Sequence, residues 1–245
     1  MTPFAWGLIL ATVGAFVVLV TRQGTPLAAA LGFAVALALV VGFGPGAIAP
    51  LALFVLGSGV LTRLGRARKE RLEMAEKDRG RRGAAHVGAK LAIPALLGLA
   101  AALRPELAPI LGAGAAAALA AAFADTAATE TGPLAGGPVV HWRGGRIARA
   151  PHGTPGGVSA AGLIAGALAA VAIAVLSRLV HLGPATGAPQ SAAAAGFGAA
   201  LVESGIAGTA WGRRAGPIGR NLFLSALATA AGCVGATVRQ GGLMR

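Results

Sequence analysis

Eight long apolar segments make up most of this chain and constrain its fold more than any other feature. They are separated by short polar stretches and lie at about residues 4–20, 26–43, 46–62, 86–103, 107–125, 157–180, 190–210 and 221–238. A helix needs about 20 apolar residues to cross the ~30 Å hydrocarbon core of a bilayer. We therefore expect an all-α, polytopic membrane helical bundle of about eight transmembrane helices, with seven as the alternative, in one integral membrane domain over residues 1–245.

Composition excludes the other classes of protein. The chain is 56% hydrophobic and only 12% charged, whereas a soluble domain carries about 25% charged residues. A disordered chain would need low hydrophobicity. The net charge of +13 suits a nucleic-acid binder, but such a protein would be rich in charge throughout, so we expect no nucleic-acid partner. The lone Cys233 lies in an apolar segment and is interpreted as a packing residue.

The basic residues predict the orientation in the membrane. If both termini are extracytoplasmic, 17 of the 21 Lys and Arg residues fall on the inner side, as cytoplasmic loops require. This topology places the protein in the cell (inner) membrane. It gives two main cytoplasmic loops, a basic one at 63–90 and a Gly-, Pro- and Arg-containing one at 131–156.

Three acidic residues lie in or beside apolar segments, near their predicted cytoplasmic ends. These are Asp125, Glu130 and Glu203. A carboxylate at bilayer depth costs several kcal/mol unless it is paired, solvated or metal-bound. We expect the three to share a cytoplasm-facing pocket, to act in catalysis and to hold Mg²⁺, which favours carboxylates together with substrate phosphates. The alternatives are a helix end satisfied by Thr hydroxyls and, for Glu203, a structural pair with an arginine.

Other polar groups fall at the same depth or next to it. On a helix Thr129 shares a face with Asp125. Ser204 and Asn221 lie in or at the start of the last two apolar segments. The segment 152–159 places Gly and Thr residues before an apolar helix, where free N–H groups and the helix dipole favour an anion. The candidate phosphate-binding residues of this segment are Gly153, Thr154, Gly156, Gly157 and Ser159. The alternative to a phosphate site is that these Pro and Gly residues only mark the point where the chain re-enters the membrane.

The basic loop 63–90 carries ten cations and four acids. Pairs such as Lys69 and Glu73, four residues apart, predict an interfacial helix within it. Arg81 and Arg82 stand in a turn before the fourth apolar segment, and arginine binds phosphate oxygens bidentately. We interpret them as a phosphate clamp. The alternative is that the loop only sets topology and attracts anionic lipid headgroups.

Arginines, carboxylates and a Gly-rich helix start together favour phosphoryl or nucleotidyl transfer, which rests on positioning and charge neutralisation. No Ser/His/Asp or Cys/His set and no H-E-x-x-H motif is present in the sequence. Because the body of the protein lies in lipid, we expect the acceptor to be a lipid whose tail lies between spans.

Several motifs resemble the domain-of-unknown-function 92 family, also called the transmembrane protein 19 family. The resemblance runs in motif order from about residue 50 to the C-terminus. It is carried by Gly59-Val60-Leu61-Thr62-Arg63-Leu64-Gly65, Arg68-Lys69, Ala75-Glu76, Gly80-Arg81-Arg82-Gly83, Ala124-Asp125-Thr126, Ala128-Thr129-Glu130, and Gly153-Thr154 with Gly156-Gly157-Val158-Ser159.

The family includes the phytyl-phosphate kinase of tocopherol synthesis. The resemblance therefore implies a CTP-preferring (or other NTP-using), Mg²⁺-dependent kinase that converts an isoprenoid monophosphate, such as a phytyl, farnesyl or geranylgeranyl phosphate, to the diphosphate. The site positions it implies are Arg63, Lys69, Glu76, Arg81, Arg82, Asp125, Thr129, Glu130, Gly156, Ser159, Glu203 and Asn221.

Two positions depart from the family pattern. Glu203-Ser204 stands where Asp-Ser is usual, so the carboxylate is one methylene longer. Gly88-Ala89-Lys90 stands where Ala-Asn-Gly is common, so a cation is present and the amide is lost.

Two rival functions remain open from the sequence. One is a kinase or nucleotidyltransferase acting on a related lipid. The other is a transporter or flippase of an anionic lipid or metabolite, although we find no inverted repeat. Membrane lipids are expected partners in every case, and the small-residue surfaces would permit a homodimer.

Overall fold

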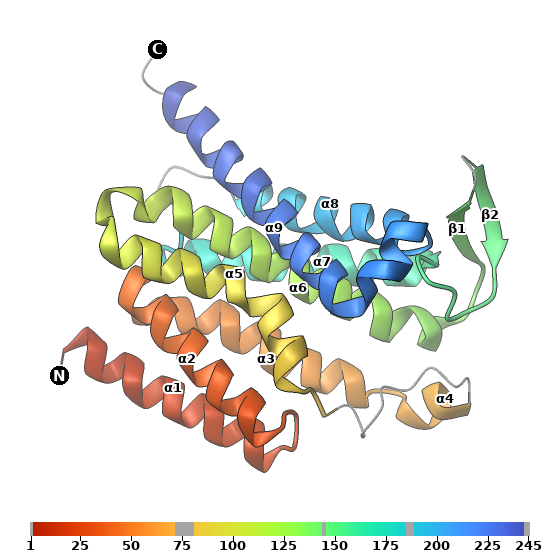
Figure 1. Cartoon of the computed structure of the whole chain (residues 1–245), viewed down its shortest axis with the longest axis horizontal. Coiled ribbons are helices and arrows are strands. Elements are labelled where there is room, and N and C mark those ends of the chain that lie inside the picture. Colours follow the sequence, from red (N-terminus) through yellow and green to blue (C-terminus); the bar gives the residue numbers. More distant parts are fainter. Residues whose placement is uncertain (1, 72–80, 144–145, 185–188, 243–245) are drawn as a thin grey trace.

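The computed structural model describes residues 2–71, 81–143, 146–184 and 189–242, and these fold mainly into helices (Figure 1). The helices are α1 (Pro3–Val20), α2 (Pro26–Phe43), α3 (Ile48–Arg63), α4 (Arg66–Arg71), α5 (Ala84–Leu103), α6 (Ala108–Ala135), α7 (Ala160–Leu179), α8 (Pro189–Ala207) and α9 (Ala210–Gly242), with one-turn 3₁₀ helices η1 (Pro45–Ala47) and η3 (Pro105–Leu107). The predicted all-α membrane bundle is confirmed.

The apolar segments became helices close to where they were predicted. Within the described residues, six helices are long and apolar enough to cross a membrane, namely α2, α3, α5, α6, α7 and α9, while α1 is apolar but shorter. The prediction of about eight spans adds α1 and α8 to these six and stays a prediction.

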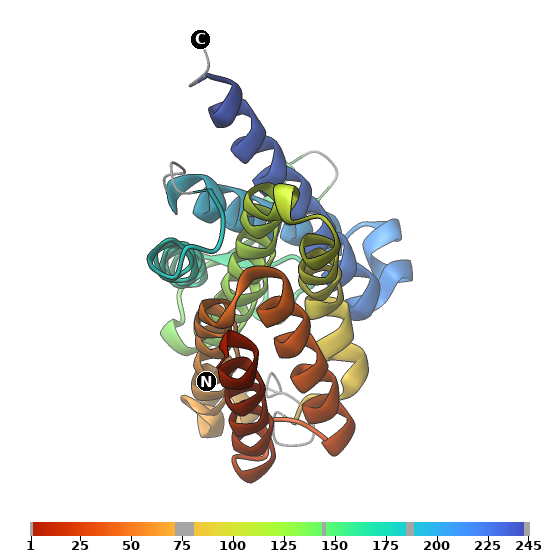
Figure 2. The same cartoon turned by 90° about the vertical axis from the view of Figure 1, so that its left-hand side faces the viewer.

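Helix α6 is the centre of the bundle. It packs against α3, α5, α7, α8 and α9. Of its most apolar 18 residues 72% are buried, compared with 28–39% in the other five candidate spans. Its middle is almost entirely alanine, and Ala115 to Ala122 are all buried. Small side chains let neighbouring backbones approach closely. In the end-on view of Figure 2, α6 therefore lies between the red and orange N-terminal helices and the blue C-terminal ones.

The two ends of the bundle differ in character. Both chain termini lie at one end in Figure 1. Helix α4, the paired strands β1 (Val139–Arg143) and β2 (Arg146–Ala150), and the connection from α8 to α9 lie at the other, which we call the polar end. The predicted cytoplasmic loops 63–90 and 131–156 thus share one end, opposite both termini. Helix α4 is the described part of the helix predicted within the basic loop.

Three features of the polar end differ from the sequence-based prediction. Helix α6 continues ten residues past the predicted end of its apolar segment. The region predicted as a loop, 131–156, contains the strands β1 (Val139–Arg143) and β2 (Arg146–Ala150). They form an antiparallel sheet in the order β2-β1-β3 with β3 (Val158–Ser159), which takes up the start of the predicted span 157–180. Helix α9 starts before the predicted 221, and a break at Gly216, with φ +63°, precedes Pro217. The break changes the direction of α9 just before Arg220.

Glycines hold α2 and α5 in close contact. A methyl group at Gly98 on α5 would overlap the carbonyl of Ala38 on α2, and one at Gly42 would overlap the carbonyl of Gly98. Overpacking of this kind typically costs about 1–3 kcal/mol. We expect Gly98→Ala to lower the melting temperature of the purified protein in detergent. Gly88→Ala, on the same helix, is the matched control, because its methyl would meet only Leu31 at an ordinary 3.6 Å; equal melting of the two variants would contradict this packing role.

Candidate functional site

In the described part of the chain, three buried or half-buried ion pairs gather around the polar end of α6. Each one joins a carboxylate that the sequence singled out to a cation from another helix. A buried charge of either sign is tolerated only when it is paired and hydrogen-bonded, which explains why these side chains converge. The structure thus brings Asp125, Glu130 and Glu203 to the same end of the bundle, as predicted, but gives each its own partner.

Glu130 is fully engaged with protein groups. Its Oε2 atom lies 2.6 Å from the Nζ of Lys69 on α4, and its Oε1 atom accepts a hydrogen bond of 2.6 Å from the hydroxyl of Thr62 on α3. The Lys69 ammonium also donates to the carbonyl of Leu61 at 2.8 Å. Lys69 is among the most buried large side chains of the described residues, at 2% exposure. This pair fastens α4 and the end of α3 to α6.

Asp125 is more open. Its Oδ2 atom accepts a hydrogen bond of 2.8 Å from the Nζ of Lys90 on α5, and 25% of its side chain is exposed. Lys90 also donates to the Thr126 hydroxyl at 2.8 Å. Among the described residues, none donates to the second carboxylate oxygen of Asp125. That oxygen is therefore available to a ligand.

The third carboxylate, Glu203, is on α8, which packs against α6. Its Oε1 atom lies 2.8 Å from the Nε of Arg220, which the break in α9 brings next to α8. The alternative interpretation of Glu203, an arginine-paired acid, is thus what the structure contains. Helix α6, which carries Asp125, packs against α8, and α5, which carries Lys90, packs against α9. The two ion pairs, Asp125 with Lys90 and Glu203 with Arg220, therefore lie on neighbouring helices, and we call these four residues the α5–α9 charge cluster.

The predicted metal site is not assembled as a trio. Within the described residues, no group of three or more His, Cys, Asp or Glu side chains could hold a metal ion. Mg²⁺, however, commonly uses one or two carboxylates and takes its other ligands from water and phosphate. Asp125 and Glu203, each with one oxygen paired, suit that role better than Glu130, which has both oxygens engaged.

Two of the predicted phosphate-binding arginines lie at a cavity between α1, α2, α3 and α5. Arg63 and Arg82 line it together with Lys90. Arg63 donates to the carbonyls of Thr21 and Gly59, and the backbone of Arg82 pairs with Gln23 and Thr25. Arg81 instead donates from Nε to the Gly24 carbonyl at 3.1 Å. The predicted clamp of Arg81 and Arg82 is thus divided, and Arg63 takes the place of Arg81 beside Arg82.

The Gly-rich segment packs against α8 next to the charge cluster. Gly153 and Gly156 have left-handed φ angles of +84° and +77°, and a side chain at Gly156 would overlap the carbonyl of Ser204. Two N–H groups, those of Thr154 and Gly157, are already used inside the turn, and the Thr154 hydroxyl donates to the Pro151 carbonyl. Ser159 caps α7 by accepting from the N–H of Gly162 at 3.2 Å, so its side chain has a structural role.

The remaining predicted residues are placed as follows. Thr129 is exposed on α6, and Ser204 and Asn221 are half-buried near Glu203 and Arg220 in sequence. Glu76 lies outside the described residues.

Four partner residues were not predicted for the site. In the sequence, Lys90 stands out only as a departure from the family pattern and Arg220 only as one of the cations that predict orientation, while nothing gives Thr62 or Thr126 a separate role. A lysine inside an apolar segment needs an anion nearby, so Lys90 carried a usable signal. The other partners make contacts between residues 17 to 68 positions apart, which a single sequence does not reveal.

Comparison with known proteins gives a family and one curated relative. The family model described as "Integral membrane protein DUF92" matches residues 7–238. An uncharacterized membrane protein of Synechocystis sp. is 37% identical over 138 residues, which cover 56% of this chain and 52% of the relative. The matched region thus spans about half the length of that protein. No solved structure matches this chain significantly.

Proposed function

Because the chain belongs to the DUF92 family of integral membrane proteins, we propose that it is a membrane kinase. It would transfer a phosphoryl group from CTP or another NTP to an isoprenoid monophosphate and release the isoprenoid diphosphate, with its active site on the cytoplasmic face of the inner membrane. An oxygen of the acceptor phosphate attacks the terminal phosphorus of the nucleotide. The bond from that phosphorus to its bridging oxygen breaks, and the nucleoside diphosphate leaves with the electron pair.

One observation carries the proposal. The half-open carboxylate of Asp125 is hydrogen-bonded to Lys90, and Lys90 also lines the cationic end of an otherwise apolar cavity. The Asp125 carboxylate is thus one hydrogen bond away from a residue that lines an apolar cavity, and such a cavity suits the hydrocarbon part of a lipid. Phosphoryl transfer needs positioning and charge neutralisation rather than a covalent nucleophile, and this arrangement supplies both.

The residues divide between those that would bind the reactants or the metal and those that would position them. Arg63, Arg82 and Lys90 would bind the acceptor phosphate, because all three line the cavity. Asp125 and Glu203 would hold Mg²⁺, which supplies neutralisation of nucleotide phosphate charge when bound. The Gly-rich turn beside Ser204 would lie against the nucleotide phosphates, and Arg220 would orient Glu203. Glu130 would position Thr62 and α4.

The test is product formation by the purified protein in detergent. With CTP, Mg²⁺ and phytyl, farnesyl or geranylgeranyl phosphate, mass spectrometry should find the corresponding diphosphate and CDP. Formation of a monophosphate from the free alcohol, or of a nucleotidyl-lipid, would identify the related lipid kinase or nucleotidyltransferase instead. Nucleotide-independent movement of the lipid phosphate across liposomes, without any diphosphate, would overturn the kinase proposal in favour of a transporter or flippase.

A further inference from the structure

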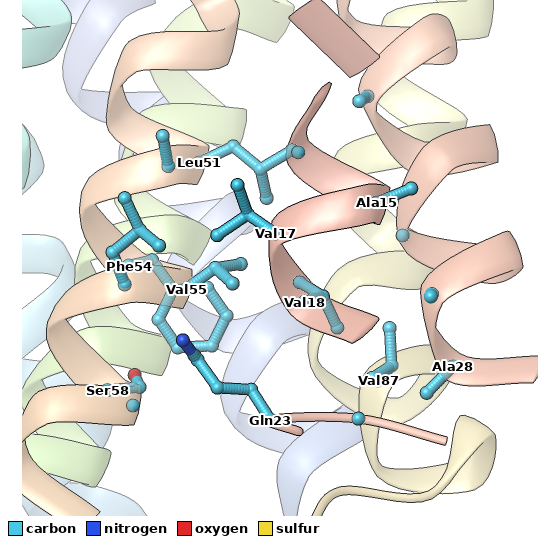
Figure 3. A pocket seen from close by; sticks show the side chains of 18 of the residues that line it. Ala15, Val17, Val18, Gln23, Ala28, Leu51, Phe54, Val55, Ser58 and Val87 are labelled. Atoms are coloured by element: carbon cyan, nitrogen blue, oxygen red, sulfur yellow. The ribbon is translucent and has the colours of Figure 1, made fainter. Parts of the chain in front are cut away.

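A cavity of about 300 Å³ lies between α1, α2, α3 and α5. Figure 3 shows Val17 of α1 facing Leu51 and Val55 of α3, Val18 on the side of Ala28 and Val87, and Gln23 at one end. Its volume is at the lower limit of small-molecule sites. On α3 the lining residues run from Ile48 to Arg63, which is about 22 Å at 1.5 Å per residue. The cavity is therefore narrow and follows the helices over much of the ~30 Å hydrocarbon core.

The polar residues that line the cavity all lie at one end of it. They come from the last turns of α3, the first turns of α5 and the two connections next to them, and they are Gln23, Ser58, Thr62, Arg63, Arg82, His86 and Lys90. Three of them are cations, and no acidic side chain is among the described lining residues. Ser58 is 3% exposed, and its hydroxyl has no hydrogen-bond partner among the described groups. The rest of the lining is apolar, so the cavity matches a molecule with an anionic head and a hydrocarbon body.

Two glycines keep this space open. A Cβ atom added at Gly14 on α1 or at Gly32 on α2 would meet no atom within 4 Å, and both residues line the cavity. Glycine inside a helix costs about 1 kcal/mol relative to alanine. Elsewhere in the bundle, at Gly98 for example, a backbone contact accounts for the glycine. At Gly14 and Gly32 no such contact is present within the described residues. Because these residues have no side chain, this part of the cavity stays open.

From these observations we infer that the cavity binds the single hydrocarbon chain of an isoprenoid monophosphate, with its phosphate at Arg63, Arg82 and Lys90. This inference rests on the proposed function and deepens it, because Lys90 connects the head of the cavity to Asp125. The chain lies between Gly14 and Gly32 and extends toward Leu10, Ala36 and Ile48. The length of the apolar part therefore selects the acceptor by chain length.

Binding without nucleotide tests the inference separately from catalysis. The wild-type protein, Gly32→Phe and Gly14→Phe are titrated with geranyl phosphate and with geranylgeranyl phosphate, and bound lipid is counted by native mass spectrometry. The phenyl ring fills the middle of the cavity. We expect each variant to bind the longer phosphate about tenfold more weakly while keeping its affinity for the shorter one.

The matched control is Gly198→Phe on α8. A Cβ atom there also meets nothing within 4 Å, but Gly198 does not line the cavity. It should bind both lipids like the wild type. Unchanged binding of the longer phosphate by both cavity variants, or an equal loss in Gly198→Phe, would overturn the inference, and melting curves of all variants exclude unfolding as the cause.

A second arm tests the head of the cavity. Arg82→Gln should weaken binding of farnesyl phosphate and leave binding of farnesol unchanged, whereas an equal effect on both would contradict a phosphate contact. The two proposals fail in different ways. Chain-dependent binding without diphosphate formation would sink the kinase and keep the cavity assignment, while diphosphate formation that is indifferent to Gly32→Phe and Gly14→Phe would do the reverse.

Discussion

Asp125→Asn is expected to abolish diphosphate formation while expression and membrane insertion stay intact. The substitution keeps the size of the side chain and removes its charge. Lys90 retains two acceptors, the Thr126 hydroxyl at 2.8 Å and the Ala122 carbonyl at 3.5 Å. Loss of one group that stabilises charge in a transition state typically lowers turnover about 10²- to 10³-fold. Initial rates with CTP and geranylgeranyl phosphate measure the effect.

A double variant separates a catalytic carboxylate from a mere counter-ion of Lys90. Asp125→Asn combined with Lys90→Gln restores a neutral pair at this position. If Asp125 holds the metal and Lys90 binds the acceptor phosphate, the double variant should be folded and no more active than Asp125→Asn alone. Recovery of turnover in the double variant would show that Asp125 only neutralises Lys90, and it would remove this carboxylate from the mechanism.

The transmembrane part of the fold could be predicted from the sequence because length and hydropathy determine it. Segments such as 26–43 became helices with the predicted limits. The prediction was wrong where polarity was taken as the end of a helix. Helix α6 continues to Ala135 because its polar residues are satisfied by other helices, as Glu130 is by Lys69 and Thr62.

The small sheet was missed for a different reason. Two adjacent glycines, Gly144 and Gly145, stand between the runs Val139–Arg143 and Arg146–Ala150. This pattern is a hairpin signal, but the region was interpreted by its Gly, Pro and Arg content alone. In the sheet Trp142 pairs with Ile147 on an exposed face. The pairing could have been predicted from residue alternation.

The acidic residues of the candidate site could be predicted from the sequence, but the basic residues that pair with them could not. Asp125, Glu130 and Glu203 attract attention because a carboxylate in an apolar segment requires an explanation. Their partners come from helices that are distant in sequence, and the choice of partner depends on packing. Arg220, for example, pairs with Glu203 from the part of α9 that follows the break at Gly216. The roles of the three acids therefore differ more than their similar sequence contexts indicated.

Lys69→Met is expected to cause a large loss of stability. Lys69 is 2% exposed, and its removal would leave the Glu130 carboxylate buried with only the Thr62 hydroxyl as partner. Breaking a buried pair in this way typically costs about 3–5 kcal/mol, whereas replacing both partners by apolar residues of similar size is often neutral or stabilising. Thermal unfolding in detergent should therefore show a low melting temperature for Lys69→Met and recovery in Lys69→Met/Glu130→Leu.

The same double variant decides what Glu130 does. Both of its oxygens are engaged by Lys69 and Thr62, so we expect Glu130 to position α3 and α4 and the folded double variant to keep measurable kinase activity. A folded but inactive double variant would instead assign Glu130 a part in the reaction. In that case the Lys69 pair would have to open during turnover, because neither Glu130 oxygen is otherwise available to a metal or a phosphate.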